Sequence, residues 1–138
     1  MIDIENDVYD ICAKALRAKY AGIFVTNEYT EEPARFPAVT IVEADNRVVE
    51  NMRTLTIENA ASLMYQVEVY SNKVGVRKSE AKEIAVEADR IFSSLGFTRT
   101  FMEQVPNLKD ASIYRIVCRY EAVVGPGAEG AYLIYQKE

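Results

Sequence analysis

The stretch SEAKEIAVEADRIFSSLGF, residues 79–97, has the most regular hydrophobic pattern in the chain. Its apolar residues recur at spacings of three, four and seven, as they do on one face of an α-helix. These residues are Ala81, Ile84, Ala85, Ala88, Ile91, Phe92 and Leu95. Gly96 can adopt the left-handed conformation that ends a helix, and Phe97 can pack back on the last turn. The stretch therefore predicts an amphipathic helix that covers a hydrophobic core.

A second amphipathic helix is predicted near the start of the chain, over residues 3–20. The apolar residues that share one face at helical spacing are Ile4, Val8, Ile11, Cys12, Ala15 and Leu16. Acidic residues lie at the start of this segment and basic residues near its end, which suits the helix macrodipole. Gly22 follows and can end the helix.

Strands are predicted on both sides of the helix at 79–97. Residues 23–29 form a short mixed segment, residues 38–42 are apolar and β-branched, and residues 63–70 alternate with a period of two. After the helix, residues 97–105 and 113–124 have strand composition. The last strand places Tyr114, Ile116, Cys118, Tyr120, Ala122 and Val124 on one face and Arg115, Arg119 and Glu121 on the other, which we expect to be solvated or at an interface.

Two segments differ from the rest of the chain. Residues 46–62 are polar, with only a weak alternation, and predict a long loop or a projecting hairpin arm. Residues 125–138 form a C-terminal extension that begins with three glycines and a proline. A short apolar strand follows at 131–135, and its residues Tyr132, Leu133, Ile134 and Tyr135 are too apolar to remain in solvent. We expect them to dock on a sheet edge of the same subunit or of a neighbour.

The element order is therefore α-β-β-β-α-β-β with a C-terminal strand. It predicts the α+β class: a single domain over residues 1–138, with one mainly antiparallel sheet packed against two amphipathic helices.

Composition excludes several classes of function. The chain has 138 residues, a net charge of -5, no histidine and no tryptophan. Without histidine there is no Ser-His or Cys-His catalysis and no His-ligated metal, and an acidic chain is a poor general nucleic-acid binder. Cys12 and Cys118 lack the CxxC spacing of a metal or redox site. We find no phosphate-binding, dinucleotide or nucleophile motif, so we expect no enzyme activity, no cofactor and no metal.

The sequence also indicates the cellular compartment in which we expect the protein. The first seven residues carry three acidic groups and no basic one, unlike a signal peptide. No apolar run is long enough to cross a membrane. We therefore expect a protein of a reducing cytoplasm without a membrane partner.

One cluster of cations stands out, formed by Lys73, Arg77, Lys78 and Lys82. The predicted helix that contains residues 79–95 opens with Arg77 and Lys78 in its first turn, where positive charge is unfavourable. Two interpretations remain open. The cluster is a solvated helix end, or it faces an acidic surface on an adjacent subunit or another protein.

Three stretches together resemble a known family: MYQVEVYSN at 64–72, LGFTRTF at 95–101 and PNLKDASIYRIVCRYEAVV at 106–124. With the helices before and between them, they resemble the tail terminator (tail completion) proteins of long-tailed bacteriophages and prophages, above all those of Gram-positive phages with contractile tails. The resemblance covers roughly residues 3–124 and carries no catalytic signature.

The resemblance implies a structural α+β subunit that forms a homo-hexameric ring on the end of the tail tube. The ring stops tube growth and provides the surface that joins the head. The implied partners are other copies of the chain, the tail tube and sheath proteins, and head-neck connector proteins, while DNA only passes through the lumen. The implied location is the host cytoplasm during assembly and then the tail or neck of the virion.

Two alternatives remain open. The first is another phage neck protein, such as a head-tail joining or head-completion factor. The second is a cytoplasmic α+β domain that binds a small ligand or has a regulatory role.

Overall fold

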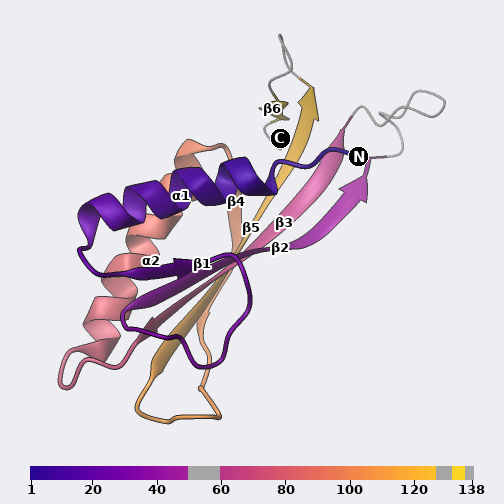
Figure 1. The fold of residues 1–138 in the computed structure, drawn as a ribbon. Coiled ribbons are helices and arrows are strands. Elements are labelled where there is room, and N and C mark those ends of the chain that lie inside the picture. Colours follow the sequence, from indigo (N-terminus) through magenta and orange to yellow (C-terminus); the bar gives the residue numbers. More distant parts are fainter. Residues whose placement is uncertain (50–59, 127–131, 136–138) are drawn as a thin grey trace.

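The computed structural model describes residues 1–49, 60–126 and 132–135. They form two helices and six strands (Figure 1). The bounds are α1 Glu5–Lys19, β1 Phe24–Thr26, β2 Ala38–Val48, β3 Ala61–Ser71, α2 Arg77–Ser94, β4 Thr98–Gln104, β5 Tyr114–Pro126 and β6 Tyr132–Tyr135. The predicted α+β class and element order are confirmed.

The strands form one sheet in the order β1-β2-β3-β5-β4, and β6 pairs with β5. β3 is central, since its Val67 lies between Ile41 of β2 and Cys118 of β5. β1 runs parallel to β2, whereas the other described pairings are antiparallel. The predicted sheet is therefore mainly antiparallel, with a mixed character that comes from the three residues of β1.

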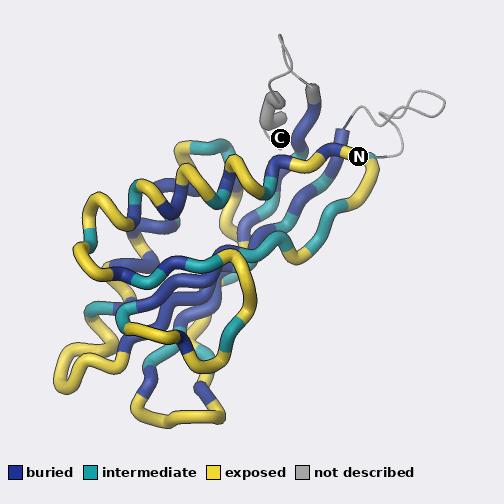
Figure 2. Tube along the Cα trace, in the orientation of Figure 1, coloured by how far each residue is buried: buried dark blue, intermediate teal, exposed yellow. Residues whose placement is uncertain are grey.

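Both helices pack on the same face of this sheet (Figure 1). The alternation of β3 explains this layering, because every second residue from Leu63 to Val69 is fully buried beneath the helices. The predicted apolar face of α2 is buried from Ala81 to Phe92. Figure 2 shows the buried residues gathered on the central strands and the exposed ones on the connections and the outer sides of the helices.

Four aromatic rings join α2 to the sheet. Phe92 of α2 stacks on Tyr120 of β5, with ring centroids 4.6 Å apart and planes 11° apart. Phe97 meets Phe92 and Tyr65 of β3 edge to face, with both centroid distances 5.4 Å. The Tyr65 hydroxyl donates to Glu43 of β2 across 3.2 Å. These contacts bind three strands and one helix into a single core.

The end of α2 has the predicted form. Gly96 has a φ of +92°, which is the left-handed conformation that glycine adopts without a steric penalty. The backbone N–H of Gly96 donates to Ser93 and that of Phe97 donates to Phe92, both across 3.0 Å. This double hydrogen bond is a Schellman motif, and it turns Phe97 back into the core.

An ion-pair cluster joins the two helices. The carboxylate of Glu87 on α2 accepts from Arg90 and from Lys19 of α1, with the Lys19 Nζ–Glu87 Oε2 distance at 3.0 Å. Hydrogen bonding from Arg90, aided by Lys19, lowers the pKa of Glu87 to about 2. The carboxylate is thus ionised throughout the neutral range and holds α1 beside α2.

The strands are longer than the sequence predicted. β2 continues to Val48 and β3 begins at Ala61, so both ends of the predicted polar segment at 46–62 are paired strand. The strand predicted for 38–42 missed this extension because Glu43, Asp45 and Asn46 are polar. Residues 50–59 of this segment and residues 127–131 and 136–138 of the C-terminal extension lie outside the described residues.

The aromatic contacts make Phe92 the first test of the fold. We predict that Phe92→Ala lowers the free energy of unfolding by about 3–5 kcal/mol, because the ring is fully buried and its removal leaves a cavity. Urea denaturation measures the change. Val86→Ala, at a 58% exposed position of the same helix, is the control and should change the value by less than about 0.5 kcal/mol. A similar small loss for both variants would contradict the central role of Phe92.

Candidate functional site

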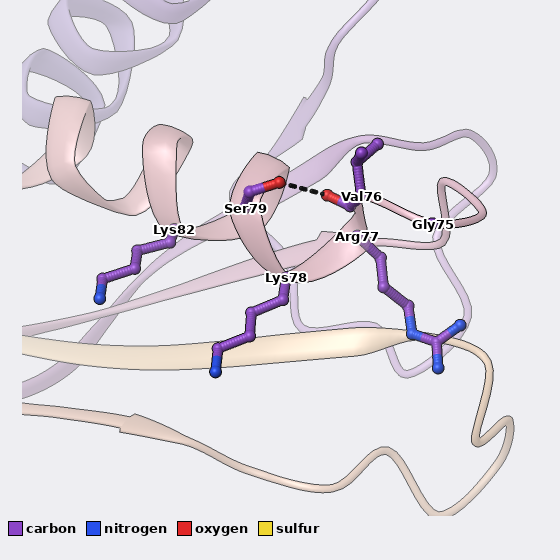
Figure 3. Close-up of a pocket in the computed structure, with 6 residues that line it drawn as sticks. All are labelled: Gly75, Val76, Arg77, Lys78, Ser79 and Lys82. Atoms are coloured by element: carbon purple, nitrogen blue, oxygen red, sulfur yellow. Dashed lines mark hydrogen bonds between the residues drawn. The ribbon is translucent and has the colours of Figure 1, made fainter.

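The predicted cluster of cations lies at the start of α2, where Figure 3 shows Arg77, Lys78 and Lys82. Lys73 lies in the connection from β3, and Arg77, Lys78 and Lys82 extend from one side of the first helical turns. All four side chains are exposed. We call residues 73–82 the basic tip. A surface depression of about 550 Å³ lies here, lined by Gly75, Val76, Arg77, Lys78, Ser79 and Lys82.

The first turn of α2 explains why the cations stay exposed. Within the described residues, no side chain caps the helix at Val76, and the Ser79 hydroxyl donates to the Val76 carbonyl across 3.0 Å. The acidic residue of this turn, Glu80, accepts from the Ser71 hydroxyl of β3 across 2.7 Å. Its carboxylate is thus held at the sheet. The positive end of the helix dipole and the side-chain cations therefore both contribute positive potential at the start of α2.

Few charges offset the basic tip. Elsewhere most buried or half-buried carboxylates have a cationic partner, as Glu87 has Lys19 and Asp89 has Arg99. In the part of the chain that the structure describes, no carboxylate lies within ion-pair distance of a cation of the basic tip. The tip thus combines solvated charges that can pair with an acidic surface without first breaking an internal ion pair.

Two valines of the basic tip were missed at the level of sequence. Val74 is 91% exposed and Val76 is 44% exposed. They flank Gly75, whose φ of +84° forms the tight turn before the helix. The signal was available, since an apolar residue between a lysine and a turn glycine has no core to enter. Apolar side chains beside cations are typical of a surface that contacts another protein.

The other predicted contact residues, Tyr132, Leu133, Ile134 and Tyr135, form β6. This strand pairs with residues 123–126 of β5 in the same chain. Of the two expected positions, a sheet edge of the same subunit or of a neighbour, the structure therefore has the first. β3 occupies the other side of β5 at residues 123 and 124, so β6 follows β4 along the same side. β6 therefore lies near the start of β3, and the basic tip follows its end. The structure does not bring the two predicted sets together.

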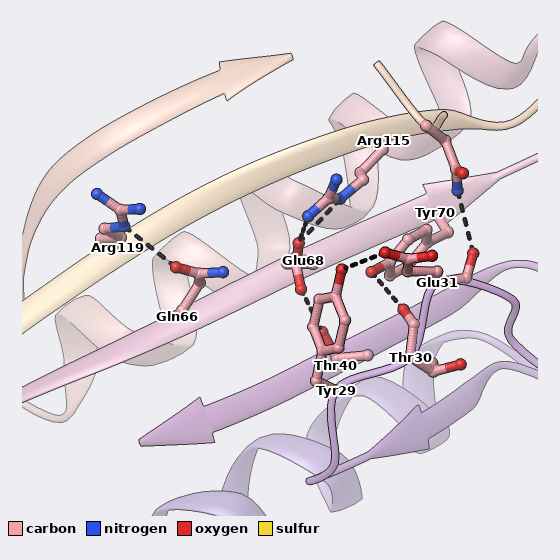
Figure 4. A network of polar contacts seen from close by, with 10 residues as sticks. Tyr29, Thr30, Glu31, Thr40, Gln66, Glu68, Tyr70, Arg115 and Arg119 are labelled. Atoms are coloured by element: carbon pink, nitrogen blue, oxygen red, sulfur yellow. Dashed lines mark hydrogen bonds and ion pairs between the residues drawn. The ribbon is translucent and has the colours of Figure 1, made fainter. Parts of the chain in front are cut away.

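The sheet face turned away from the helices carries a buried ion pair (Figure 4). Glu68 of β3 accepts from Nε of Arg115 on β5 across 2.9 Å, and the two side chains are 2% and 17% exposed. Thr40 lies 3.5 Å from the second oxygen of the carboxylate. Burial opposes the charge of Arg115, but the hydrogen bond to Glu68 and the electrostatic attraction of that carboxylate together outweigh burial and raise the pKa of Arg115. The guanidinium of Arg115 is therefore charged at neutral pH.

The connection from β1 to β2 covers this ion pair. The Tyr70 hydroxyl donates to the carbonyl of Thr30 across 2.8 Å, and the Asn107 side chain donates to the carbonyl of Glu31 across 3.2 Å (Figure 4). Small cavities of about 140 and 110 Å³ remain on either side. They are smaller than the usual site for a small ligand, and their polar groups already have partners.

The expectation for the Arg115 and Arg119 face is therefore only partly correct. Arg119 is exposed, donates to Gln66 across 3.1 Å and lies 4.9 Å over the ring of Phe101. Arg115, by contrast, is half-buried in the ion pair with Glu68. The sequence pattern missed this because the cover comes from a connection distant in the chain.

Reactive side chains are scarce among the described residues. No group of three or more histidine, cysteine or acidic residues is placed to hold a metal ion within those residues. Cys12 and Cys118 are both free and buried, and burial raises the pKa of Cys12 to about 12. Its thiol is thus unreactive at neutral pH.

Comparisons with known proteins do not identify a function for the chain. No protein family model and no curated protein sequence matches the chain. Among the described residues, neither helix is both long and apolar enough to cross a membrane.

The pairing of β6 predicts a structural role for the C-terminal extension. We expect deletion of residues 128–138 to lower the free energy of unfolding by about 1–3 kcal/mol, because backbone groups of β5 lose their partners. Thermal and urea denaturation measure the loss. Deletion of residues 136–138, which spares β6, is the control. An unchanged melting temperature together with unchanged assembly would reject this role.

The geometry of the basic tip predicts that its charges do not stabilise the fold. We expect the double variant Lys78→Glu, Lys82→Glu to fold normally, with a free energy of unfolding that is unchanged or higher by up to about 1 kcal/mol at low salt. The gain should shrink in high salt, where the helix dipole is screened. Urea denaturation at two salt concentrations tests this. A loss of more than about 1 kcal/mol would mean that the lysines have a structural role.

Proposed function

We propose that the chain is a structural subunit of a phage tail terminator, which forms a hexameric ring on the end of the tail tube and provides the surface for head joining. The observation that carries this proposal is the basic tip, an exposed set of cations and valines that is suited to contact with another protein. The element order and the strand stretches at 64–72, 95–101 and 106–124 support it, since they resemble the same family.

The shape of the subunit is also suited to assembly. β2, β3 and β5 project beyond the start of α1, and edge strand β4 is exposed at every position except the half-buried Phe101 (Figure 1). Projecting strands and exposed edges offer backbone groups to neighbouring subunits. In this proposal the ring assembles in the host cytoplasm, contacts tube, sheath and neck proteins, and has no catalytic role.

The small-ligand alternative has less support. The cavities beside Glu68 are small, and the depression at the basic tip is lined by exposed side chains from one connection and two helical turns. A neck protein other than the terminator would use a basic tip in the same way. The position of the protein in the particle separates these two structural roles.

The proposal predicts six-fold rings. The purified chain should assemble at high concentration or on the ends of tail tubes, and light scattering with negative-stain images measures the mass and symmetry. Tube protein polymerised with and without the chain provides the control, because capped tubes should stop growing. A monomer in dilute solution decides nothing, since a subunit can wait for the tube before it assembles. A chain that never caps tubes would contradict the proposal.

A further inference from the structure

The start of α1 carries a second exposed set of side chains. Asp7, Asp10 and Ile11 fall on one face of the helix, and Asp3 lies just before its first turn. All of these aspartates are exposed, and Ile11 is 49% exposed although it was predicted to lie on the buried face. Among the described residues, neither Asp7 nor Asp10 is in an ion pair. We call residues 3–11 the acidic start.

The acidic start and the basic tip lie at different levels along the sheet. The backbone N–H of Glu43, midway along β2, donates to the Glu5 carboxylate across 3.1 Å and fixes the start of α1 there. The hydrogen bond from Ser71 to Glu80 fixes the start of α2 at the end of β3. Because β2 and β3 are antiparallel, about six residues of strand, or roughly 20 Å, separate the two levels.

The two surfaces are complementary in charge and in apolar content. Each has an exposed apolar centre, Val74 and Val76 at the basic tip and Ile11 at the acidic start. Lys73, Arg77 and Lys78 lie beside the valines, and Asp7 and Asp10 lie beside Ile11, with Lys14 one turn further along the same face. The chain has a net charge of -5, and with the four cations of the basic tip set aside the remainder carries -9. The basic tip is thus an isolated positive surface on a negative molecule, which favours association with another copy of the chain.

We propose that the basic tip of one subunit binds the acidic start of the next. This inference rests on the proposed ring, and it names the two surfaces that meet. Two different surfaces at separate positions on a subunit make a head-to-tail contact, which closes into a ring when the rotation between neighbours permits. The apolar centres pack together, while the charges orient the subunits and speed their encounter.

Cross-linking between single-cysteine variants tests the contact directly. Val74→Cys subunits mixed with Ile11→Cys subunits should give a disulfide-linked pair under oxidising conditions, at a concentration where the parent chain associates. Neither variant alone should give this pair, because a head-to-tail contact joins different positions. The native Cys12 and Cys118 are buried, so the parent chain measures the background of disulfide formation by these two residues. Val86→Cys, exposed on the outer side of α2, replaces Val74→Cys in the control and should not cross-link.

Charge reversal tests the electrostatic part. Lys78→Glu with Lys82→Glu should weaken association about tenfold at physiological salt, while circular dichroism shows a normal fold. Adding Asp7→Lys and Asp10→Lys should restore it. The alternative acidic surface is the β1–β2 connection, where Glu28 and Glu32 are exposed. Glu28→Lys with Glu32→Lys is therefore the matched control and should not restore association.

The outcomes separate this inference from the proposed function. Hexameric rings without the cross-link, or with rescue by the Glu28 and Glu32 variants alone, overturn the inference and leave the terminator proposal standing. Cross-linking and rescue by the Asp7 and Asp10 variants in open chains or in rings of another size support the inference and contradict the hexamer. A parent chain that associates neither in solution nor on tubes overturns both.

Discussion

The packing of Phe92 against Tyr65, Phe97 and Tyr120 is the interaction on which the rest of the structure depends. It fixes α2 across the central strands, and α1 then has its place beside α2 through Glu87. With both helices on one face, the opposite face must bury its polar groups beneath connections. The start of α2 is left at the end of the sheet with its cations in solvent.

Local patterns predicted the helices and most strands because the relevant spacing lies within a single element. The Schellman motif after α2 was predictable for the same reason, since Gly96 and Phe97 directly follow the helix. The parallel pairing of β1 with β2 was not, because it depends on contacts between segments separated by an eleven-residue connection. The burial of Glu68 was also not predictable from the alternation of residues along β3, because alternation indicates only that every second residue shares a face.

The candidate contact surfaces also differ in whether they depend on local sequence or on contacts between distant segments. The basic tip was found from the sequence because its cations lie within ten residues of one another. Its valines could have been found in the same way. The position of the acidic start was not predictable, since it depends on hydrogen bonds that join Glu5 to Glu43 and Ile2 to Asn46, both in the distant strand β2. Ile11 is 49% exposed, which differs from the prediction because helical spacing indicates only that residues share a face and not how much of that face is covered.

The ion pair between Glu68 and Arg115 also restricts how β3 and β5 can align. A slip of one residue would turn every core side chain outward, so the hydrophobic pattern alone prevents it. A slip of two residues would keep the alternation intact, and hydrophobic packing discriminates against it less sharply. It would, however, separate the carboxylate from the guanidinium and leave charge buried without a partner, at a cost of about 3–5 kcal/mol. The ion pair thus favours one register of β3 against β5, the one in which eleven residues of each strand are paired.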